Sequence, residues 1–417
     1  MTKHTSRREF LAAFPGAFAA PYLLTSQAMG AGTGPPASER VHIGHIGLEW
    51  MGGIHLSYYK DLAGVRSVAA CDVDSRYLEA GARKMESYSG GKCKRYKDFR
   101  RLLDDPDVDA VLIAVPDHWH ALISIHAAQA GKDIYCEKPL SLTIREARAM
   151  VEAVRRYGRV FQTGSQQRAS GNFRHACELV RSGYIGTVRH VTVSVGGPSG
   201  PCYLPPQPTP SYIDWDMWLG PAPQRAFSDR IHSRRWRAYR DYSGGGMTDW
   251  GAHHFDIAQW GLGMDASGPV AVHPPDGTQH KHLTYQYANG VTMIRGDCNG
   301  VLFEGTEGKV EVNRGHLRTK PPQLRSLALG PNDVHLRRAP TGSWRGNTLD
   351  WLGCIRTRER SLCDVEIGCR SVTVCHLGNL ALWLGRSIRW DPAAERIVGD
   401  DEASRWLDRP KRAPWHL

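Results

Sequence analysis

Short apolar runs alternate with amphipathic segments over residues 40–161. Almost wholly apolar runs, such as residues 108–115, are typical of parallel strands that are covered on both faces. Segments with helical spacing of apolar residues separate these runs, and Gly131 and Gly158 each follow such a segment. The alternation predicts an open parallel sheet, in which ligands gather at the carboxyl ends of the strands.

The second half of the chain changes to short alternating segments. Two pairs of such segments flank turns, one at Asn289-Gly290 and one at residues 305–308. Asn-Gly between alternating segments is a strong signal for a β-hairpin. Consecutive hairpins predict an antiparallel sheet, and helical spacing over residues 349–356 and 365–384 predicts two late helices beside it.

The first thirty residues have the pattern of an export signal. The pair Arg7-Arg8 is followed by an apolar stretch that reaches residue 24 and then by small residues. This pattern is typical of a secretory signal, and the arginine pair indicates the twin-arginine route. We predict a signal peptide over residues 1–30 and a flexible linker over residues 31–39.

Two prolines argue against the alternative, a buried N-terminal helix. Pro15 and Pro21 would each disrupt such a helix. The apolar stretch is also shorter than the roughly 20 helical residues that span a bilayer, so no stable membrane span is expected. We predict a periplasmic or otherwise exported protein that the twin-arginine machinery transports.

Composition bears on the partners and on the thiols. The 417 residues carry a formal net charge of +11 and ten cysteines. The arginines are dispersed, without a zinc finger, helix-turn-helix or basic run, so no nucleic-acid partner is expected. The twin-arginine route exports proteins that have already folded, typically around a cofactor. The thiols therefore need not form disulfides, and a tightly bound cofactor is expected.

A dinucleotide site is predicted near the start of the parallel sheet. Gly47 and Gly52 occupy the first and third positions of G-x-G-x-x-G after an apolar strand. Asp72 ends the next strand, twenty residues after Gly52, at the spacing of the acid that binds the adenosine ribose. An acid there favours NAD over NADP, because a carboxylate would repel a 2′-phosphate.

The middle glycine of this motif is replaced by Glu49. A side chain at this position obstructs the approach of the pyrophosphate, and a carboxylate repels it. The loop could turn Glu49 outward, cofactor binding could be weakened, or the site could be inactive. We favour the first interpretation, because the strand, the helix and Asp72 are all present.

Three further segments resemble the signatures of one enzyme family. Pro116-Asp117-His118-Trp119-His120 follows one predicted strand, and Glu137-Lys138-Pro139 follows the next. Asp249 and His253 form an Asp-x-x-x-His pair later in the chain. On these motifs residues 40–417 resemble the Gfo/Idh/MocA oxidoreductases, which include glucose–fructose oxidoreductase and inositol dehydrogenase.

The resemblance implies a fold, a cofactor and partners. It implies an α/β fold with an NAD-binding Rossmann domain, built on a parallel sheet, over residues 40–161. Over residues 162–417 it implies an α+β domain with a large open, mostly antiparallel sheet for substrate binding and oligomerisation. The expected cofactor is NAD, and the expected partners are a sugar or cyclitol and other copies of the chain in a homo-oligomer.

The same resemblance implies three catalytic residues. Lys138 would bind the substrate oxygen and stabilise a developing alkoxide. His253 would remove the hydroxyl proton, because imidazole is a suitable base near neutral pH. Asp249 lies four residues earlier, on the same face of a helical turn, and could hold the tautomer of His253.

The expected cofactor contacts lie on the loops that follow the strands. They comprise Gly47, Leu48, Trp50, Met51, Gly52, Asp72, Pro116, Asp117, His120, Glu137 and Lys138. Asp117 and His120 have an equal alternative, which is to cap a helix that starts near Ala121.

Substrate contacts are predicted at Arg168, Trp236 and Arg240, because arginines and aromatic rings suit acidic sugars and sugar rings. The alternative is a tryptophan core with solvated arginines. Several histidines occur, but no His-Glu-x-x-His motif or cysteine pair accompanies them, so no metal is expected.

Three functions remain open at this stage. The first is an exported oxidoreductase that acts on a hydroxyl of a sugar, glycoside or cyclitol with tightly bound NAD. The second is an NAD-dependent glycoside hydrolase, which oxidises the ring transiently and eliminates the aglycone. The third is a non-catalytic sugar-binding relative that Glu49 has disabled, against which the presence of Lys138, Asp249 and His253 argues.

Overall fold

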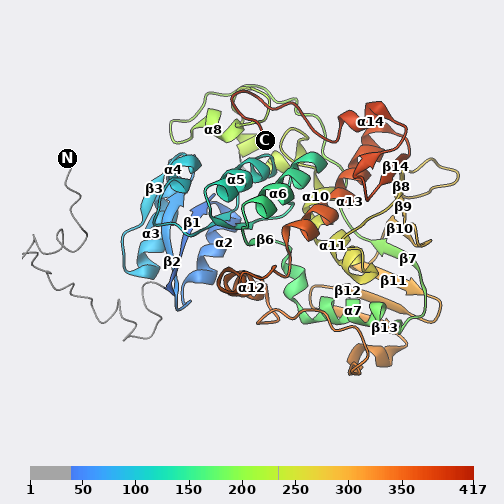
Figure 1. Ribbon diagram of the computed structural model, residues 1–417. Helices are drawn as coiled ribbons and strands as arrows, with labels where there is room; N and C mark the ends of the chain where they lie inside the picture. Colours follow the sequence, from blue (N-terminus) through green and yellow to red (C-terminus); the bar gives the residue numbers. More distant parts are fainter. Residues whose placement is uncertain (1–38, 233) are drawn as a thin grey trace, which may run out of the picture. The chain divides into compact units, whose positions relative to one another are not determined.

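The computed structural model describes residues 39–232 and 234–417 (Figure 1). The predicted signal peptide and nearly all of the linker lie outside the described residues. Residues 41–417 form one compact unit. Within the described part of the chain, no helix is long and apolar enough to cross a membrane.

A six-stranded parallel sheet forms the first half of this unit, in the order β3-β2-β1-β4-β5-β6. Its strands are Val41–Ile46 (β1), Val65–Cys71 (β2), Lys94–Tyr96 (β3), Ala110–Ile113 (β4), Asp133–Cys136 (β5) and Phe161–Thr163 (β6). Strands β4 and β5 are buried along their whole length, as the apolar runs predicted. This strand order is that of a Rossmann fold, so the predicted parallel sheet is confirmed.

Helices connect these strands. They are Trp50–Tyr59 (α2), Ser75–Ser89 (α3), Phe99–Leu103 (α4), Asp117–Gln129 (α5) and Ile144–Arg156 (α6). Helix α5 begins earlier than predicted, at Asp117, directly after Pro116. An acidic residue in the first turn is favourable there, because it faces the positive end of the helix dipole. Asp117 and His120 therefore lie inside the helix and do not cap a helix that starts at Ala121.

A nine-stranded sheet forms the second half, in the order β13-β12-β11-β7-β10-β9-β8-β14-β15. Its strands are Val188–Val193 (β7), Ala271–His273 (β8), Thr284–Gln286 (β9), Thr292–Arg295 (β10), Val301–Gly305 (β11), Lys309–Asn313 (β12), His316–Lys320 (β13), Ile388–Asp391 (β14) and Arg396–Ile397 (β15). Only the β7–β10 pair is parallel, which confirms a mostly antiparallel sheet.

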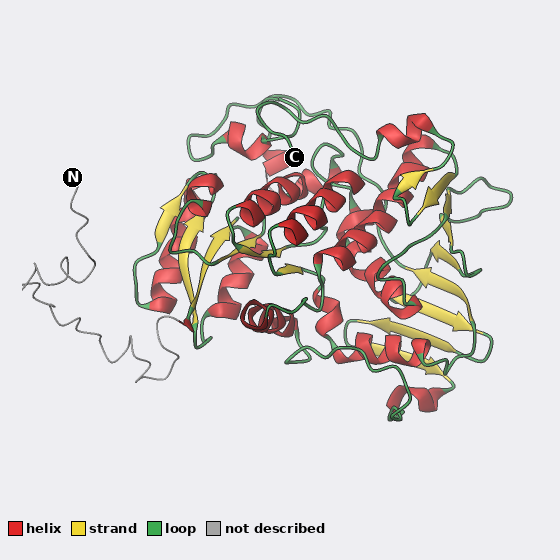
Figure 2. Cartoon of the chain, viewed as in Figure 1, coloured by secondary structure: helices red, strands yellow, loops and turns green. Residues whose placement is uncertain are grey.

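The helical segments of this half are Gln166–Ala169 (η2), Gly171–Arg181 (α7), Trp215–Leu219 (α8), Asp229–His232 (α9), Arg235–Ala238 (η3), Gly246–Asp249 (α10), Gly251–Leu262 (α11), Pro322–Ser326 (η4), Trp344–Thr357 (α12), Val365–Leu384 (α13) and Asp401–Arg405 (α14). Helices α7, α11 and α13 pack on one face of the nine-stranded sheet. Alternate residues of its strands, such as Val191 and Phe303, are fully buried beneath them. Helices α6, α13 and α11 lie between the two sheets, as Figure 2 shows.

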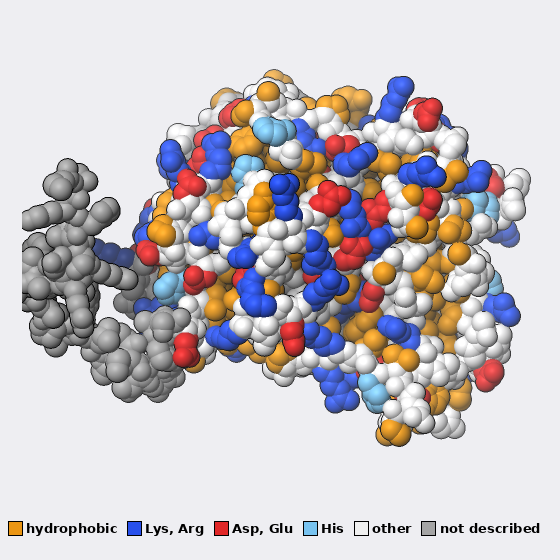
Figure 3. Space-filling view, in the orientation of Figure 1, with side chains coloured by type: hydrophobic (Ala, Val, Ile, Leu, Met, Phe, Trp, Pro, Cys, Tyr) orange, Lys and Arg blue, Asp and Glu red, His pale blue; other side chains and the backbone are white. Residues whose placement is uncertain are grey.

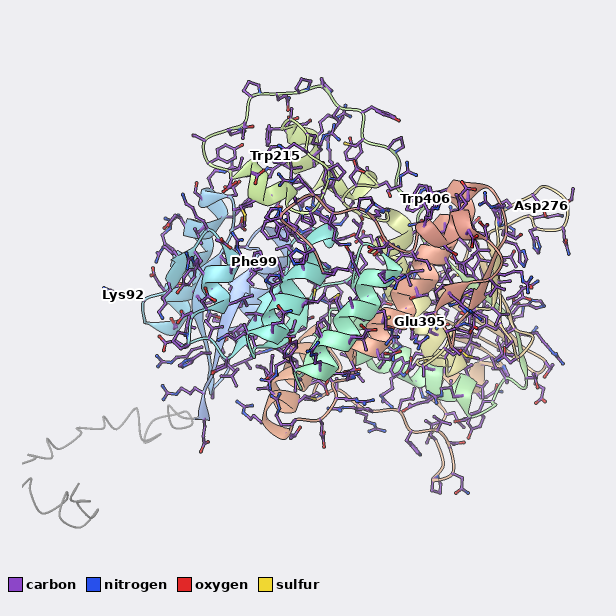
Figure 4. The ribbon with its side chains drawn as sticks, turned by 45° about the horizontal axis from the view of Figure 1, so that its top comes forward. Lys92, Phe99, Trp215, Asp276, Glu395 and Trp406 are labelled. Carbon is purple, nitrogen blue, oxygen red and sulfur yellow. The ribbon has the colours of Figure 1, made fainter. Side chains whose placement is uncertain are left out.

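The C-terminal part of the chain also covers the parallel sheet. Trp351 of α12 is fully buried and packs against Tyr135 of β5. Arg148 of α6 donates to Glu366 of α13 at 2.8 Å and 2.9 Å and also bonds Glu395, which is labelled in Figure 4. Helix α13 therefore packs with both sheets: its first turns, with Val365 and Cys369, belong to the core of the parallel sheet, and its later turns, with Val374 and Leu377, belong to the core of the nine-stranded sheet.

Charge and thiols are distributed as the sequence suggested. On the face drawn in Figure 3, Lys and Arg side chains are interspersed with Asp and Glu side chains. All ten cysteines lie within the described residues and are free, and all but Cys202 and Cys298 are buried.

Candidate active site

A cavity of about 300 Å³ opens at the carboxyl ends of the parallel strands. The loops after β1, β2, β4 and β5 form one wall, and segments of the second half of the chain form the other. The predicted residues on its lining are Gly47, Leu48, Trp50, Met51, Asp72, Pro116, Asp117, Glu137, Lys138, Trp236, Asp249 and His253. A ligand in this cavity would contact both halves of the molecule.

Two glycines shape the loop between β1 and α2. Gly47 has φ of +86°, and a Cβ there would lie 2.4 Å from the carbonyl oxygen of Ala114. Gly52 packs so closely that a Cβ would lie 2.0 Å from the carbonyl oxygen of Gly47. Gly52 does not line the cavity. Its lack of a side chain allows the first turn of α2 to pack directly on the loop at Gly47.

The N-terminus of α2 fits the diphosphate of a dinucleotide. No acceptor among the described residues bonds the backbone N–H groups of Trp50, Met51 and Gly52. Open N–H groups at a helix N-terminus, together with the helix dipole, favour an anion. The donor set therefore suits a nucleotide cofactor at this wall.

Asp72 supports the same loop from the end of β2. Its carboxylate accepts the N–H of Leu48 at 2.8 Å and the N–H of Asp74 at 2.9 Å. Burial raises the pKa of Asp72 to about 7, despite these two hydrogen bonds. The side chain lines the cavity, as expected for a residue that binds a ribose hydroxyl.

Glu49 does not turn away from the site, contrary to the interpretation that we favoured. It lines the cavity, and its Oε1 lies 3.6 Å from Nε of Arg234, which lines the cavity too. Burial raises the pKa of Glu49, and the charges of Arg234 and Arg237 oppose this shift. The negative charge is therefore balanced locally by an arginine from the second half of the chain.

Lys138 and Asp249 form the central ion pair of the cavity. Nζ of Lys138 donates to Oδ1 of Asp249 at 2.6 Å and to its backbone carbonyl at 3.0 Å. Nε of Arg237 lies 3.5 Å from the same Oδ1. Burial alone would raise the pKa of Asp249, but Lys138 and Arg237 together lower it. Asp249 is therefore a carboxylate that orients two cations.

His253 is the third residue of α11, which begins directly after Trp250 at the end of α10. It is buried, and neither of its ring nitrogens bonds another described residue. Burial first, and then the charges of Lys138 and Arg314, lower its pKa well below 6.5. The imidazole is therefore neutral at physiological pH and free to accept a proton. Because Asp249 bonds Lys138 instead, the expectation that Asp249 holds the tautomer of His253 is wrong.

Glu137 anchors the loop that carries Lys138. It accepts from Nε2 of His55 at 2.7 Å and from Nε2 of Gln166 at 2.9 Å. Burial alone would raise the pKa of Glu137, but His55 and Lys138 outweigh this effect and lower it. Glu137 lines the cavity, and its fixed position also fixes the neighbouring lysine.

The first turn of α5 contributes one cavity residue and one structural residue. Asp117 lines the cavity and accepts from the hydroxyl of Ser243 at 2.7 Å, while burial raises its pKa to about 7. His120 lies behind it, within 2.8 Å of the carbonyl oxygen of Val115 and 2.7 Å of that of Pro139. His120 thus ties two strand-end loops together and does not line the cavity.

Two predicted substrate contacts are wrong. Arg168 is 1% exposed and bonds Asp256 and Asp265. Arg240 stacks over the rings of Trp383 and Trp406, and Trp406 is labelled in Figure 4. Neither arginine lines the cavity, because each is committed to partners within the fold.

Several lining residues were missed by sequence reasoning. Arg314 sits in the turn between β12 and β13, and its guanidinium lies 4.8 Å from the ring centres of Trp250 and Trp344. Trp250 lies between Asp249 and His253 in the sequence, and this position is the one signal that could have identified Trp250 as a lining residue. The turn at Arg314 and the first residue of α12 carry no local signature of a site.

No group of three or more His, Cys, Asp or Glu side chains arranged to hold a metal ion occurs within residues 39–232 and 234–417.

Two family models together match most of the described chain. One describes the NAD-binding Rossmann fold of an oxidoreductase family and matches residues 41–165. The other describes the C-terminal alpha/beta domain of an oxidoreductase family and matches residues 174–417. Each match coincides with one of the two sheets.

Individual relatives match shorter stretches. A myo-inositol 2-dehydrogenase of Thermotoga maritima is 33% identical over 161 residues, which are 39% of this chain and 47% of that protein. A glycosyl hydrolase family 109 protein of Shewanella pealeana is 29% identical over 163 residues, 37% of this chain and 35% of that protein. The chain thus spans less than half the length of either relative.

The fold has counterparts among solved structures. The crystal structure of an aldose-aldose oxidoreductase from Caulobacter crescentus, complexed with glycerol, has a TM-score of 0.61 and 22% sequence identity to this chain. The match covers 84% of this chain and 99% of that chain. A likeness at this level of identity concerns the fold.

Proposed function

Because the chain belongs to the Gfo/Idh/MocA oxidoreductase family, we propose that it is an NAD-dependent oxidoreductase that acts on a hydroxyl of a sugar, glycoside or cyclitol. One observation carries the proposal. Lys138, Asp249 and His253 meet at the wall of the cavity that also contains the open N-terminus of α2. A proton acceptor and an oxygen-binding cation therefore stand beside a nucleotide site.

Each of the three side chains has a distinct task. Asp249 holds the ammonium group of Lys138, which donates a hydrogen bond to the substrate oxygen and stabilises negative charge on it. Neutral His253 takes the hydroxyl proton. When bound, NAD accepts the hydride from the same carbon. The C–OH group loses one proton and one hydride and becomes a carbonyl.

The cofactor would be held by the loop after β1, the N-terminus of α2, and Asp72. Asp72 supports NAD as the cofactor, because an ionised carboxylate that binds the adenosine ribose would repel a 2′-phosphate. Asp117 and Glu137 line the part of the cavity next to Lys138.

The experiment compares three outcomes for the purified full chain. Denaturation should release NAD or NADH into the supernatant, and incubation with free sugars should give a ketosugar. Release of aglycone from aryl glycosides would favour the hydrolase that the Shewanella relative suggests. No nucleotide and no product would refute both catalytic proposals and favour a sugar-binding role.

We also propose export by the twin-arginine route and assembly into a homo-oligomer. The Arg7-Arg8 pair supports the first, and replacing it with two lysines should keep the protein in the cytoplasm. The second is supported by the nine-stranded sheet, because α7, α11 and α13 all pack on one of its faces. Light scattering after size exclusion should give at least twice the mass of a single chain, which is 46.4 kDa for all 417 residues.

A further inference from the structure

An arginine between two tryptophans forms a distinct corner of the cavity. Arg314 comes from the turn between β12 and β13, Trp250 from the turn between α10 and α11, and Trp344 from the start of α12. The guanidinium lies 4.8 Å from each ring centre. Both rings are substantially exposed, at 41% for Trp250 and 40% for Trp344, so they leave surface for a ligand.

The guanidinium of Arg314 makes no direct ion pair with the described residues, although Asp249 acts on its charge from a longer distance. No carboxylate among the described residues forms an ion pair or a hydrogen bond with its guanidinium. The neighbouring cations differ, because Lys138 and Arg237 share Asp249, and Arg234 faces Glu49. Arg314 is therefore an exposed cation with no carboxylate in direct contact among the described residues, and arginine stays charged at any physiological pH.

The corner lies on the reacting side of the cavity. The charge of Arg314 lowers the pKa of His253 and interacts favourably with Asp249. The rings of Trp250 and His253 are 6.0 Å apart. A ligand group held by Arg314 would therefore belong to the molecule whose hydroxyl faces His253.

The geometry selects the kind of anion. The two rings beside the guanidinium restrict its rotation. A planar guanidinium in a fixed orientation can donate two parallel hydrogen bonds to one carboxylate. A phosphate carries up to two charges and three acceptor oxygens, which favour several cations or a helix N-terminus. One arginine between apolar rings offers one charge and a stacking surface, which suits a carboxylate on a sugar ring.

We propose that Arg314 binds the carboxylate of the substrate and that the substrate is an acidic sugar, of the hexuronate class. This inference rests on the proposed function, since it places the acidic sugar in the same cavity as Lys138 and His253. Trp250 and Trp344 hold the guanidinium in place and contact the ring.

The test uses matched pairs of sugars, D-glucuronate with D-glucose and D-galacturonate with D-galactose. Binding is measured by quenching of tryptophan fluorescence, and kcat/KM by formation of the oxidised sugar. The purified full chain should prefer at least one uronate to its neutral partner. Arg314→Gln should reduce kcat/KM and affinity for that uronate about 10- to 100-fold, and Arg314→Lys by less.

A matched control separates local from general charge effects. Arg318 lies on β13 of the same hairpin, is exposed and does not line the cavity. Arg318→Gln should therefore leave both the uronate affinity and the kinetics of the neutral sugars unchanged to within about 3-fold.

Two results would overturn the inference. They are equal or better use of the neutral sugars by the wild-type protein, and uronate binding that Arg314→Gln leaves intact. Failure of the proposed function looks different, because the protein would then release no nucleotide and oxidise no sugar. Uronate binding by fluorescence would still test Arg314 in that case.

Discussion

At the scale of single residues, the site combines a neutral base with a fixed cation. The pKa of His253 lies well below 6.5 because the ring is buried beside two cations. The free-base form is thus available throughout the neutral range. Lys138 is held by Asp249, so the cation next to the substrate oxygen does not depend on a mobile side chain.

The pH dependence of turnover follows from this arrangement. Because the pKa of His253 is lowered, kcat/KM should not fall between pH 7.5 and 6 through protonation of this imidazole. His253→Gln should reduce kcat/KM about 10²- to 10⁴-fold at every pH in that range. His254→Gln is the matched control, because His254 bonds the carbonyl oxygen of Ser194 at 2.7 Å. An inflection near pH 6.5 that disappears in His253→Gln would contradict this assignment.

Substitutions of Glu49 and of Arg234 should change the affinity for NAD in opposite directions. Glu49→Gln leaves the charge of Arg234 unbalanced and should tighten NAD binding about 3- to 10-fold, while Arg234→Gln should weaken it by a similar factor. Titration calorimetry with NAD measures both effects. Arg230→Gln, which changes an exposed arginine of the same segment outside the cavity, should have no effect. Equal affinity in all the variants would mean that the pair does not face the cofactor.

Sequence could identify most of the site on the first half of the chain, because strand-end loops carry recognisable motifs. It assigned Arg168 and Arg240 to the substrate wrongly, and it did not single out Arg314. Arg168 and Arg240 have distant partners, such as Asp256 and Trp406, and no local pattern shows them. Arg314 reaches the cavity only because the second sheet brings its turn there.

At the scale of elements, the start of α2 is the most constrained part of the site. Its first N–H groups face the cavity, and its close contact with the loop after β1 depends on Gly52. The alternation of apolar segments predicted this helix and the strands around it. It placed the start of α5 too late, because the first turn, with two histidines and an aspartate, lacks an apolar pattern.

Gly52→Ala should show how far the site depends on this contact. The added Cβ would meet the Gly47 carbonyl, so the helix must shift, which we expect to cost about 1 to 3 kcal/mol of unfolding free energy and to loosen NAD retention. Gly53→Ala is the matched control, because its nearest neighbour beyond adjacent residues is 3.6 Å away. Thermal unfolding and nucleotide release measure both consequences. Equal stability and retention in the two variants would show that the close contact is unimportant.

At the scale of the whole molecule, helix α13 joins the packing of the two sheets. Helix α13 contacts α6 on the Rossmann side and the nine-stranded sheet on the other, so the halves are expected to unfold together. Sequence predicted the two sheets but not this packing. The reason is that α12 and α13 are distant in sequence from the strands β5 and β6 that they help to cover.

Buried histidines should make the stability of the whole chain fall in acid. Burial lowers the pKa of His376 to about 4, so the unfolded chain binds a proton below pH 6.5 that the folded chain does not. Stability is therefore lost as the pH falls, by about 2 kcal/mol at pH 5 for such a group. His376→Gln should reduce the difference in unfolding free energy between pH 7.5 and pH 5 by about this amount. The exposed His282→Gln should not, and an unchanged pH dependence in His376→Gln would contradict the prediction.

The central claim is that NAD bound in this cavity would take a hydride from a sugar carbon. His253 takes the hydroxyl proton, and Lys138 stabilises the negative charge on the oxygen. The most direct measurement begins by incubating the purified protein with sugars that are deuterated at their ring carbons. The protein is then denatured, and the mass of the released nucleotide is measured by mass spectrometry. We predict one deuterium in the nicotinamide ring, and incorporation that is slower by about 100-fold or more after Lys138→Met or His253→Gln. Turnover of the sugar with no deuterium in the bound nucleotide would contradict the account.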